Sequence, residues 1–308
     1  MSNYTWQPRN RFFEVGTALN AHNDSDFKVA MMNELDLSRL EELRRRCYAV
    51  HGKKPSYTAL VATAVALAFK RFPQFNVLPV RWPWFQRLVQ LHSIDISVGV
   101  ERQVEGAQQA SYVHTLYNTL DRDALALTEE LREVAHADPE TLPRWQAFRG
   151  LIMRLPIWLV GWLVNLPYLS PSLWHKHRGG GVLISSPAKY GVDALVGTWP
   201  WPIGFSFGLV KERAVVVDHR VEARPTMTLS MSFDRRLMGG AEAARFFREI
   251  CDQLETASAL QPVANDTNDA LRAAANTSGA TVRPIRPTVR SCSATQQASN
   301  GRSPAYSE

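Results

Sequence analysis

The sequence is poor in cysteine, and its three cysteines (Cys47, Cys251 and Cys292) stand far apart. They show neither the spacing of a metal site nor the even number of a disulfide framework. We therefore predict no metal-ligand set. We also predict a reducing compartment, because small domains of oxidising compartments are usually dense in disulfides.

The first twenty residues lack the apolar run behind basic residues that marks a secretory signal peptide. Together with the scarcity of cysteine, this favours a cytoplasmic protein.

A strong charge excess is also missing. The net charge of +6 is the difference between 35 basic and 29 acidic residues, which are spread along the chain. An excess this modest does not predict a nucleic-acid partner. It fits a phosphate-bearing ligand, and it fits a generally basic surface equally well.

No uninterrupted apolar run approaches the ~20 residues that a membrane-spanning helix needs. The most apolar stretch, 149–174, is broken by Arg154, Pro156, Gly161 and Asn165. Three interpretations stay open for it: a core or oligomer-interface helix, a wall for an apolar acyl substrate, or a peripheral contact with a membrane surface.

The periodicity of apolar residues predicts alternating strands and helices. Strands are expected at 27–35, 94–100, 181–186 and 226–233, with a hairpin formed by 205–210 and 214–218. Helices are expected from Ser38 past Cys47, over 56–72 and 121–137, and over 241–255 with a stripe of Ala244, Phe247, Ile250 and Leu254. This order predicts an α/β fold, in the form of an α+β two-layer sandwich.

Composition divides the chain into three parts. Residues 1–25 are polar and irregular and form a predicted N-terminal arm, and 26–261 form the predicted domain. From 262 to 308 Ser, Thr, Asn, Ala and Pro dominate, so this tail is predicted to be disordered because it cannot bury enough apolar surface to offset its ordering entropy.

Several segments resemble one known family in order and spacing. They are Asn33-Glu34-Leu35-Asp36 leading into a helix, Ile94-Asp95-Ile96-Ser97-Val98-Gly99-Val100 on a strand, and Asp234-Arg235-Arg236-Leu237-Met238-Gly239-Gly240 between a strand and a helix. The chain is therefore similar to the catalytic domain of the 2-oxoacid dehydrogenase dihydrolipoyl acyltransferases, in the chloramphenicol acetyltransferase-like superfamily. In that family the last segment reads D-H-R-x-x-D-G.

The resemblance implies a mixed β-sheet with flanking helices and a homotrimer, in some members a larger cage, with active sites between subunits. It implies acyl transfer from a thioester on coenzyme A, a lipoyl group or a carrier protein. Coenzyme A or the acyl thioester would then be a substrate, and no tightly bound cofactor is expected. The family's histidine removes a proton from the acyl acceptor, and a serine on a facing strand donates a hydrogen bond to the oxyanion.

The family's site residues carry over only in part. Ser185, in Leu183-Ile184-Ser185-Ser186, matches the oxyanion serine, and Asp234, Arg236 and Gly240 keep the signature. Arg235 replaces the base histidine, and Gly239 replaces the polar residue before the last glycine. Arginine stays protonated in proteins, so Arg235 cannot act as the base, although it could bind a phosphate, a carboxylate or the oxyanion.

Three other histidines are candidates for a substitute base. His175 and His177 precede the Gly179-Gly180-Gly181 triplet, and His219 lies in a predicted turn. Two hypotheses follow. The chain is an acyltransferase-family protein with a non-standard active site, or it is an inactive homologue that serves as a trimeric or cage-forming scaffold or thioester-binding partner.

Overall fold

A computed structural model describes residue 15 and residues 27–82, 85–104, 107–138, 145–146 and 148–257. The predicted arm, apart from Val15, and the predicted tail lie outside these residues. The chain divides into two compact units, Met1–Val263 and Ala264–Glu308, and the described residues all belong to the first.

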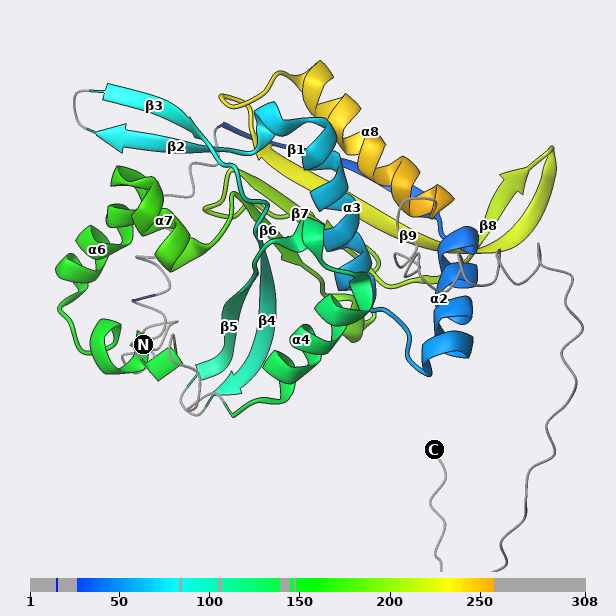
Figure 1. Cartoon of the computed structure of the whole chain (residues 1–308), viewed down its shortest axis with the longest axis horizontal. Helices are drawn as coiled ribbons and strands as arrows, with labels where there is room; N and C mark the ends of the chain where they lie inside the picture. Colours follow the sequence, from blue (N-terminus) through cyan, green and yellow to red (C-terminus); the bar gives the residue numbers. More distant parts are fainter. Residues whose placement is uncertain are drawn as a thin grey trace, which may run out of the picture. The chain divides into compact units, whose positions relative to one another are not determined.

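A seven-stranded mixed sheet forms the centre of the fold (Figure 1). The strand order is β1-β9-β7-β6-β4-β5, and β8 pairs with the first residues of β9. The pairs β4–β6 and β6–β7 are parallel and the others antiparallel. The strands are β1 (Lys28–Asp36), β4 (Ile96–Val104), β5 (Ala107–Leu116), β6 (Val182–Ser185), β7 (Ile203–Phe207), β8 (Lys211–Val217) and β9 (Arg220–Asp234).

Four helices form the second layer over one face of this sheet (Figure 1). They are α2 (Ser38–His51), α3 (Tyr57–Arg71), α4 (Ala124–His136) and α8 (Gly240–Thr256). Short 3-10 turns lie at Pro73–Phe75, Thr119–Asp121 and Ala188–Tyr190. Residues of all four helices and of the central strands share one buried apolar cluster, and the Phe69 and Phe246 rings lie 5.0 Å apart within it. The predicted two-layer fold with a mixed sheet is confirmed.

The sequence of α3 explains its position and its ends. Nine of its residues are buried, as expected for a helix without a polar face. The hydroxyl of Ser56 caps its first turn by accepting a hydrogen bond from the Ala59 N–H (3.2 Å). Pro73 follows the helix directly, as its inability to continue a helix requires.

The alternation of β9 is also confirmed. Met227, Leu229, Met231 and Phe233 are at most 1% exposed and face the helices. The serines of the opposite face are covered by the loop before β7, where the Leu195 carbonyl accepts from the Ser230 hydroxyl (2.6 Å). Gly204 is needed on this face, because a Cβ there would lie 2.4 Å from the Trp199 ring.

Some predicted details were wrong. Residues 205–210 and 214–218 do not form a hairpin, because β7 is paired between β6 and β9, and β8 pairs with the beginning of β9. The β8–β9 turn consists of Asp218 and His219, both with positive φ, as expected of a tight two-residue hairpin turn. In α8 the exposed Ala244 does not belong to the buried stripe, which runs through Ala243 and Phe246.

Two further features were not predicted. One is β5, and the other is a separate hairpin of β2 (Val77–Trp82) and β3 (Phe85–Gln90). The apolar stretch 149–174 forms a π-helical turn (Phe148–Ile152), α6 (Ile157–Leu169) and the start of α7 (Pro171–Arg178). None of the described helices is long and apolar enough to cross a membrane.

Candidate active site

Ser185 is the last residue of β6, in the middle of the sheet. Its register partner on β7 is Ser206, and Gly99 of β4 lies on its other side, where an added Cβ would come within 3.8 Å of the Ser185 Oγ. The Ser185 side chain is half-buried, and its hydroxyl contacts no hydrogen-bond partner in the described part of the chain. The neighbouring Ser186 differs, because its hydroxyl donates to the Phe207 carbonyl (2.9 Å). Ser185 therefore has a hydroxyl free to donate to a ligand.

Asp234 and Arg236 form a tight ion pair within the signature turn. Arg236 donates from Nε to one carboxylate oxygen of Asp234 (2.9 Å) and from Nη2 to the other (2.6 Å), and its backbone N–H also donates to the carboxylate (3.0 Å). Burial raises the pKa of the Asp234 carboxyl, but these hydrogen bonds outweigh it, so the pKa lies below its usual value. The guanidinium also stacks on Phe27, 4.1 Å from the ring centre. The pair fixes the shape of the turn.

Arg235 stands between the two residues of this pair in the sequence. Its backbone N–H donates to the Phe27 carbonyl (2.9 Å), and its side chain is exposed. Gly239 and Gly240 begin α8 with no heavy atom within 4 Å of the place where a Cβ would stand, and neither has a positive φ. Neither position requires a glycine for steric reasons, so a polar side chain at 239 would fit.

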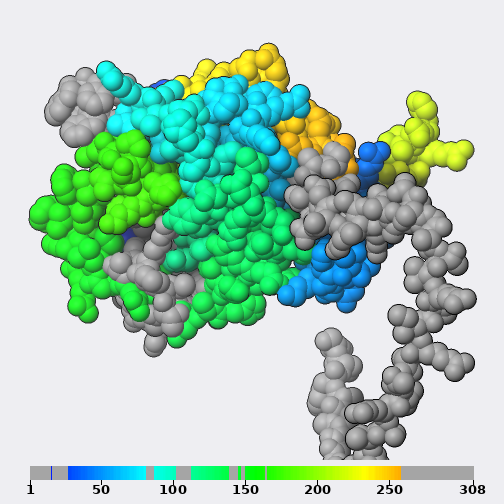
Figure 2. Space-filling model, in the orientation of Figure 1, coloured from blue at the N-terminus to red at the C-terminus, as the bar shows by residue number. Residues whose placement is uncertain are grey.

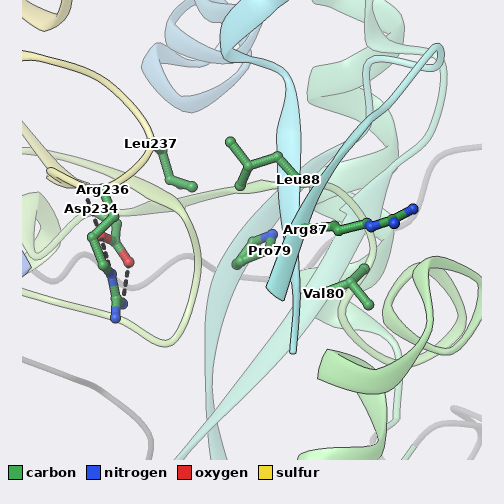
Figure 3. A pocket seen from close by; sticks show the side chains of 7 residues that line it. All are labelled: Pro79, Val80, Arg87, Leu88, Asp234, Arg236 and Leu237. Carbon is green, nitrogen blue, oxygen red and sulfur yellow. Dashed lines mark hydrogen bonds and ion pairs between the residues drawn. The ribbon is translucent and has the colours of Figure 1, made fainter. Parts of the chain in front are cut away.

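A cleft of about 200 Å³ lies between the signature turn and the β2–β3 hairpin. Leu88 and Leu237 point toward one another across it, whereas Arg87 points to the other face of the hairpin (Figure 3). The residues that line the cleft are Pro79, Val80, Arg87, Leu88, Asp234, Arg236 and Leu237. The cleft adjoins the signature but not Ser185.

Ser185 and the signature lie at different ends of the sheet. Ser185 is in register with Ser206, which pairs with Ser230 on β9, and Asp234 lies four residues farther along β9. At about 3.3 Å per residue and about 4.8 Å per strand, Ser185 and Asp234 are separated by about 16 Å. Ser185 and Arg235 of one chain therefore cannot act on the same atom.

His175 is held by a buried carboxylate. Its Nε2 lies 3.0 Å from Oδ2 of Asp95, whose side chain is 2% exposed. Asp95 also accepts from the Ser93 hydroxyl (2.7 Å) and from the Asn118 N–H (2.9 Å), so its orientation is fixed. The His175 side chain is 46% exposed, and among the described residues no hydrogen bond involves its Nδ1. This is the arrangement of an oriented histidine base.

The two remaining histidines are placed less favourably. His177 is exposed near the end of α7. His219 is exposed at the tip of the β8–β9 hairpin, eleven residues along β9 from Ser230, which is about 36 Å. Within the described ranges no carboxylate orients His219, and no three His, Cys, Asp or Glu side chains are grouped so that they could hold a metal ion.

Asp95 is the site residue that sequence reasoning missed. In the sequence it stands only within the strand segment 94–100, with no role assigned to it. The signal that could have drawn attention to it is a carboxylate between two buried or half-buried isoleucines, Ile94 and Ile96, because a buried carboxylate needs a partner.

The family model described as 2-oxoacid dehydrogenases acyltransferase (catalytic domain) matches residues 15–135 and 177–261, which is more than half of the chain. The chain belongs to this family. Among curated proteins it is similar to the lipoamide acyltransferase component of the branched-chain alpha-keto acid dehydrogenase complex of Pseudomonas putida, with 23% identity over 235 residues. The match covers 74% of this chain and 47% of that protein, so the chain spans about half the length of this relative.

Solved structures show the same fold. The dihydrolipoamide acetyltransferase of Azotobacter vinelandii matches with a TM-score of 0.62 and 21% identity over 84% of this chain and 94% of that one. For that enzyme, the structure was studied together with the role of a serine, a histidine and an asparagine in its catalytic mechanism. The cubic core of a pyruvate dehydrogenase multienzyme complex matches with a TM-score of 0.61 and 21% identity, again over 84% and 94% of the two chains. At these identities the likeness is one of fold.

Proposed function

We propose that this family member transfers an acyl group from a thioester, on coenzyme A, a lipoyl group or a carrier protein, to a nucleophilic acceptor. The observation that carries the proposal is the unpartnered Ser185 hydroxyl at the end of a central strand. A hydroxyl that bonds to no described residue can donate to the oxyanion that forms when an acceptor attacks the thioester carbonyl. The carbon–sulfur bond then breaks, and the thiol leaves with the acceptor's proton.

His175 is the base in this proposal. Asp95 binds its Nε2 and leaves Nδ1 to take the proton from the acceptor. Arg235 cannot do this, because a guanidinium keeps its proton. An acceptor amine that is already deprotonated would attack without a base, and for such a substrate His175 would be dispensable.

The proposed site is shared between subunits. Asp95 precedes Gly99, the neighbour of Ser185, by four residues, which is about 13 Å along β4. His175 and Ser185 of one chain are therefore too far apart to act on one thioester. In a homotrimer, the assembly that the family resemblance implies, the histidine of one subunit would face the serine of the next, and trimers could in turn build a larger cage.

Arg235 is assigned to binding rather than proton transfer. In the Azotobacter vinelandii enzyme the named histidine and asparagine stand four residues apart, as Arg235 and Gly239 do here. An exposed guanidinium at this position can bind a phosphate of coenzyme A or a substrate carboxylate through charge-assisted hydrogen bonds.

The test is turnover of acyl-coenzyme A by the purified chain, with thiols, alcohols and amines as acceptors. The readout is free coenzyme A, separated from acyl-coenzyme A by chromatography, because transfer to a thiol acceptor leaves the total thiol unchanged. We expect Ser185→Ala to lower kcat by about 10²-fold, the size of a lost oxyanion donor. The matched control is Ser186→Ala, whose hydroxyl donates to a backbone carbonyl. Wild-type turnover no higher than that of Ser185→Ala across all acceptors contradicts the proposal.

A second candidate is a scaffold without catalysis. The exposed Arg235 and the empty space around Gly239 favour it, because the signature keeps the Asp234–Arg236 pair that shapes the turn while lacking its base and polar neighbour. In this case the domain, 26–261, would contribute assembly or thioester binding, and the tail, 262–308, would act as a tether.

A further inference from the structure

The family model's match is interrupted over the segment between α4 and β6. The family model matches 15–135 and resumes at 177, so residues 136–176 lie outside the match. They include all of α6 and most of α7. Figure 1 shows these two helices beside the β2–β3 hairpin, apart from the helices that cover the sheet.

The outer face of α6 is aromatic and uncharged. Trp158 and Trp162, one helical turn apart, are 73% and 59% exposed, and Ile157 beside them is 39% exposed. The opposite side of the helix is buried through Val160. Figure 2 shows this part of the chain, in green, open at the surface. A surface helix normally presents charged residues to water, and α6 has none.

The helix is held firmly in this orientation. Tyr168, near its end, packs edge-on against Trp174 of α7, with the ring centres 5.1 Å apart, and both belong to one buried apolar cluster with Leu78 of β2. Trp174 donates to the Gly180 carbonyl (3.1 Å). The buried Arg178 lies 5.3 Å from the ring centres of Tyr168 and Trp174 and donates to the Pro200 carbonyl (2.8 Å). The exposed tryptophans therefore sit on a rigid base.

The charged residues of this part of the sequence have one sign. Residues 141–192 contain no aspartate or glutamate, but they contain six lysines and arginines. Arg154, in the turn before α6, and Lys176, in the last turn of α7, are exposed. Elsewhere in the chain acidic and basic residues are interspersed and equal in number, 29 of each, because six of the 35 basic residues lie in 141–192.

We infer that this face, defined by Leu151, Arg154, Ile157, Trp158, Trp162 and Lys176, binds the surface of an anionic lipid bilayer. Tryptophan is preferred where a bilayer meets water, because its ring is apolar and its N–H is polar. Cations beside an apolar helix face add attraction to anionic headgroups. A two-fold contact between two copies of this face is disfavoured, because the six residues that define the face include no carboxylate to pair with its cations. The domain would thereby work on acyl groups next to a membrane.

The experiment measures partition of the full chain into vesicles by co-sedimentation. Vesicles of phosphatidylcholine alone are compared with vesicles in which about a third of the lipid is phosphatidylglycerol. We expect binding to the anionic vesicles and a blue shift of tryptophan emission. Trp158→Ala with Trp162→Ala should weaken binding by at least about tenfold. Lys176→Ala should weaken it about fivefold, and only for the anionic vesicles.

The control replaces two other exposed apolar residues, Val216→Ala and Val221→Ala, which are 70% and 73% exposed on the β8–β9 hairpin. This variant should bind vesicles as the wild type does. Equal binding by the tryptophan and valine variants overturns the inference. The inference is also overturned if the wild-type protein binds neither kind of vesicle. If, in addition, loss of Trp158 and Trp162 lowers the assembly size measured by light scattering, the face joins copies of the chain instead.

Discussion

Ser185 and Asp234 lie at different ends of one sheet, with β7 between their strands and four residues of offset along them. Asp234, which directly precedes Arg235 in the signature, is thus separated from the serine that the family resemblance pairs with this signature by about 16 Å within one chain. His175, with its Asp95 partner, is also remote from Ser185. A working site made from these residues needs a second subunit.

Intersubunit complementation tests this requirement. Ser185→Ala and His175→Asn, each strongly impaired alone, should regain activity when co-expressed, because some sites then combine an intact serine with an intact histidine. For random mixing in a cyclic trimer, about a quarter of the sites are complete, so about a quarter of the wild-type rate is expected. The measurement is release of free coenzyme A from acyl-coenzyme A. The control is co-expression of two differently tagged Ser185→Ala chains, which should stay impaired.

A co-expressed mixture no more active than its parents would contradict the shared site. Purification through both tags, one on each variant, ensures that the tested assemblies contain both chains, so that a lack of activity cannot be attributed to separate homotrimers. In these mixed trimers one site in three is complete, so the expected rate after this purification is about a third of the wild-type rate.

Rebuilding the family signature separates the two candidate functions. Arg235→His together with Gly239→Asp supplies a histidine and a polar neighbour, and the space around Gly239 admits the new side chain. With His175 as the base, the double variant should lose activity, since it removes the cation that binds the substrate. A gain in kcat of about 10²–10⁴-fold, the usual rate enhancement from a general base, would instead show that the natural site is degenerate and would support the scaffold function.

The Asp234–Arg236 pair should stabilise the fold at neutral pH. Arg236→Met leaves a buried carboxylate without its strongest partner and should cost about 2 kcal/mol in the free energy of unfolding. Because the folded-state pKa of Asp234 is lowered, this contribution is present above the unfolded pKa and is lost as pH falls through the folded pKa. Urea unfolding of both proteins at pH 7 and in the acid range measures the difference.

The matched control is Arg245→Met, which removes an exposed pair with Glu242 whose side chains are 64% and 46% exposed. Such a pair should change the free energy of unfolding by less than about 0.5 kcal/mol. A loss for Arg236→Met that is just as small, or that does not shrink in acid, would show that the turn holds its shape by other means.

The sequence predicts the layers of this fold better than its site. The alternation of β9 and the apolar α3 locate the core, because burial leaves a local period in the sequence. The β2–β3 hairpin and β5 were missed. The His175–Asp95 contact joins residues 80 positions apart, and no local pattern connects them. Likewise, the separation of Ser185 from Arg235 depends on strand order, which a single sequence does not reveal.

Two glycines should respond oppositely to alanine. A Cβ on Gly180 would lie 1.6 Å from the Asp95 carbonyl oxygen, so the backbone that positions Asp95 and His175 must move. Gly180→Ala should therefore lower the free energy of unfolding by about 1–3 kcal/mol, the usual cost of overpacking. It should also reduce the hydrogen-exchange protection of the Asn118 amide, which donates to Asp95.

Gly161 lies inside α6, and no heavy atom lies within 4 Å of the place where its Cβ would stand. Gly161→Ala should therefore raise the free energy of unfolding by about 0.5–1 kcal/mol. Thermal melts of both variants, followed by circular dichroism, decide the matter. If Gly180→Ala melts with the wild type and leaves Asn118 protected, the close approach of Gly180 to Asp95 does not fix the His175 site.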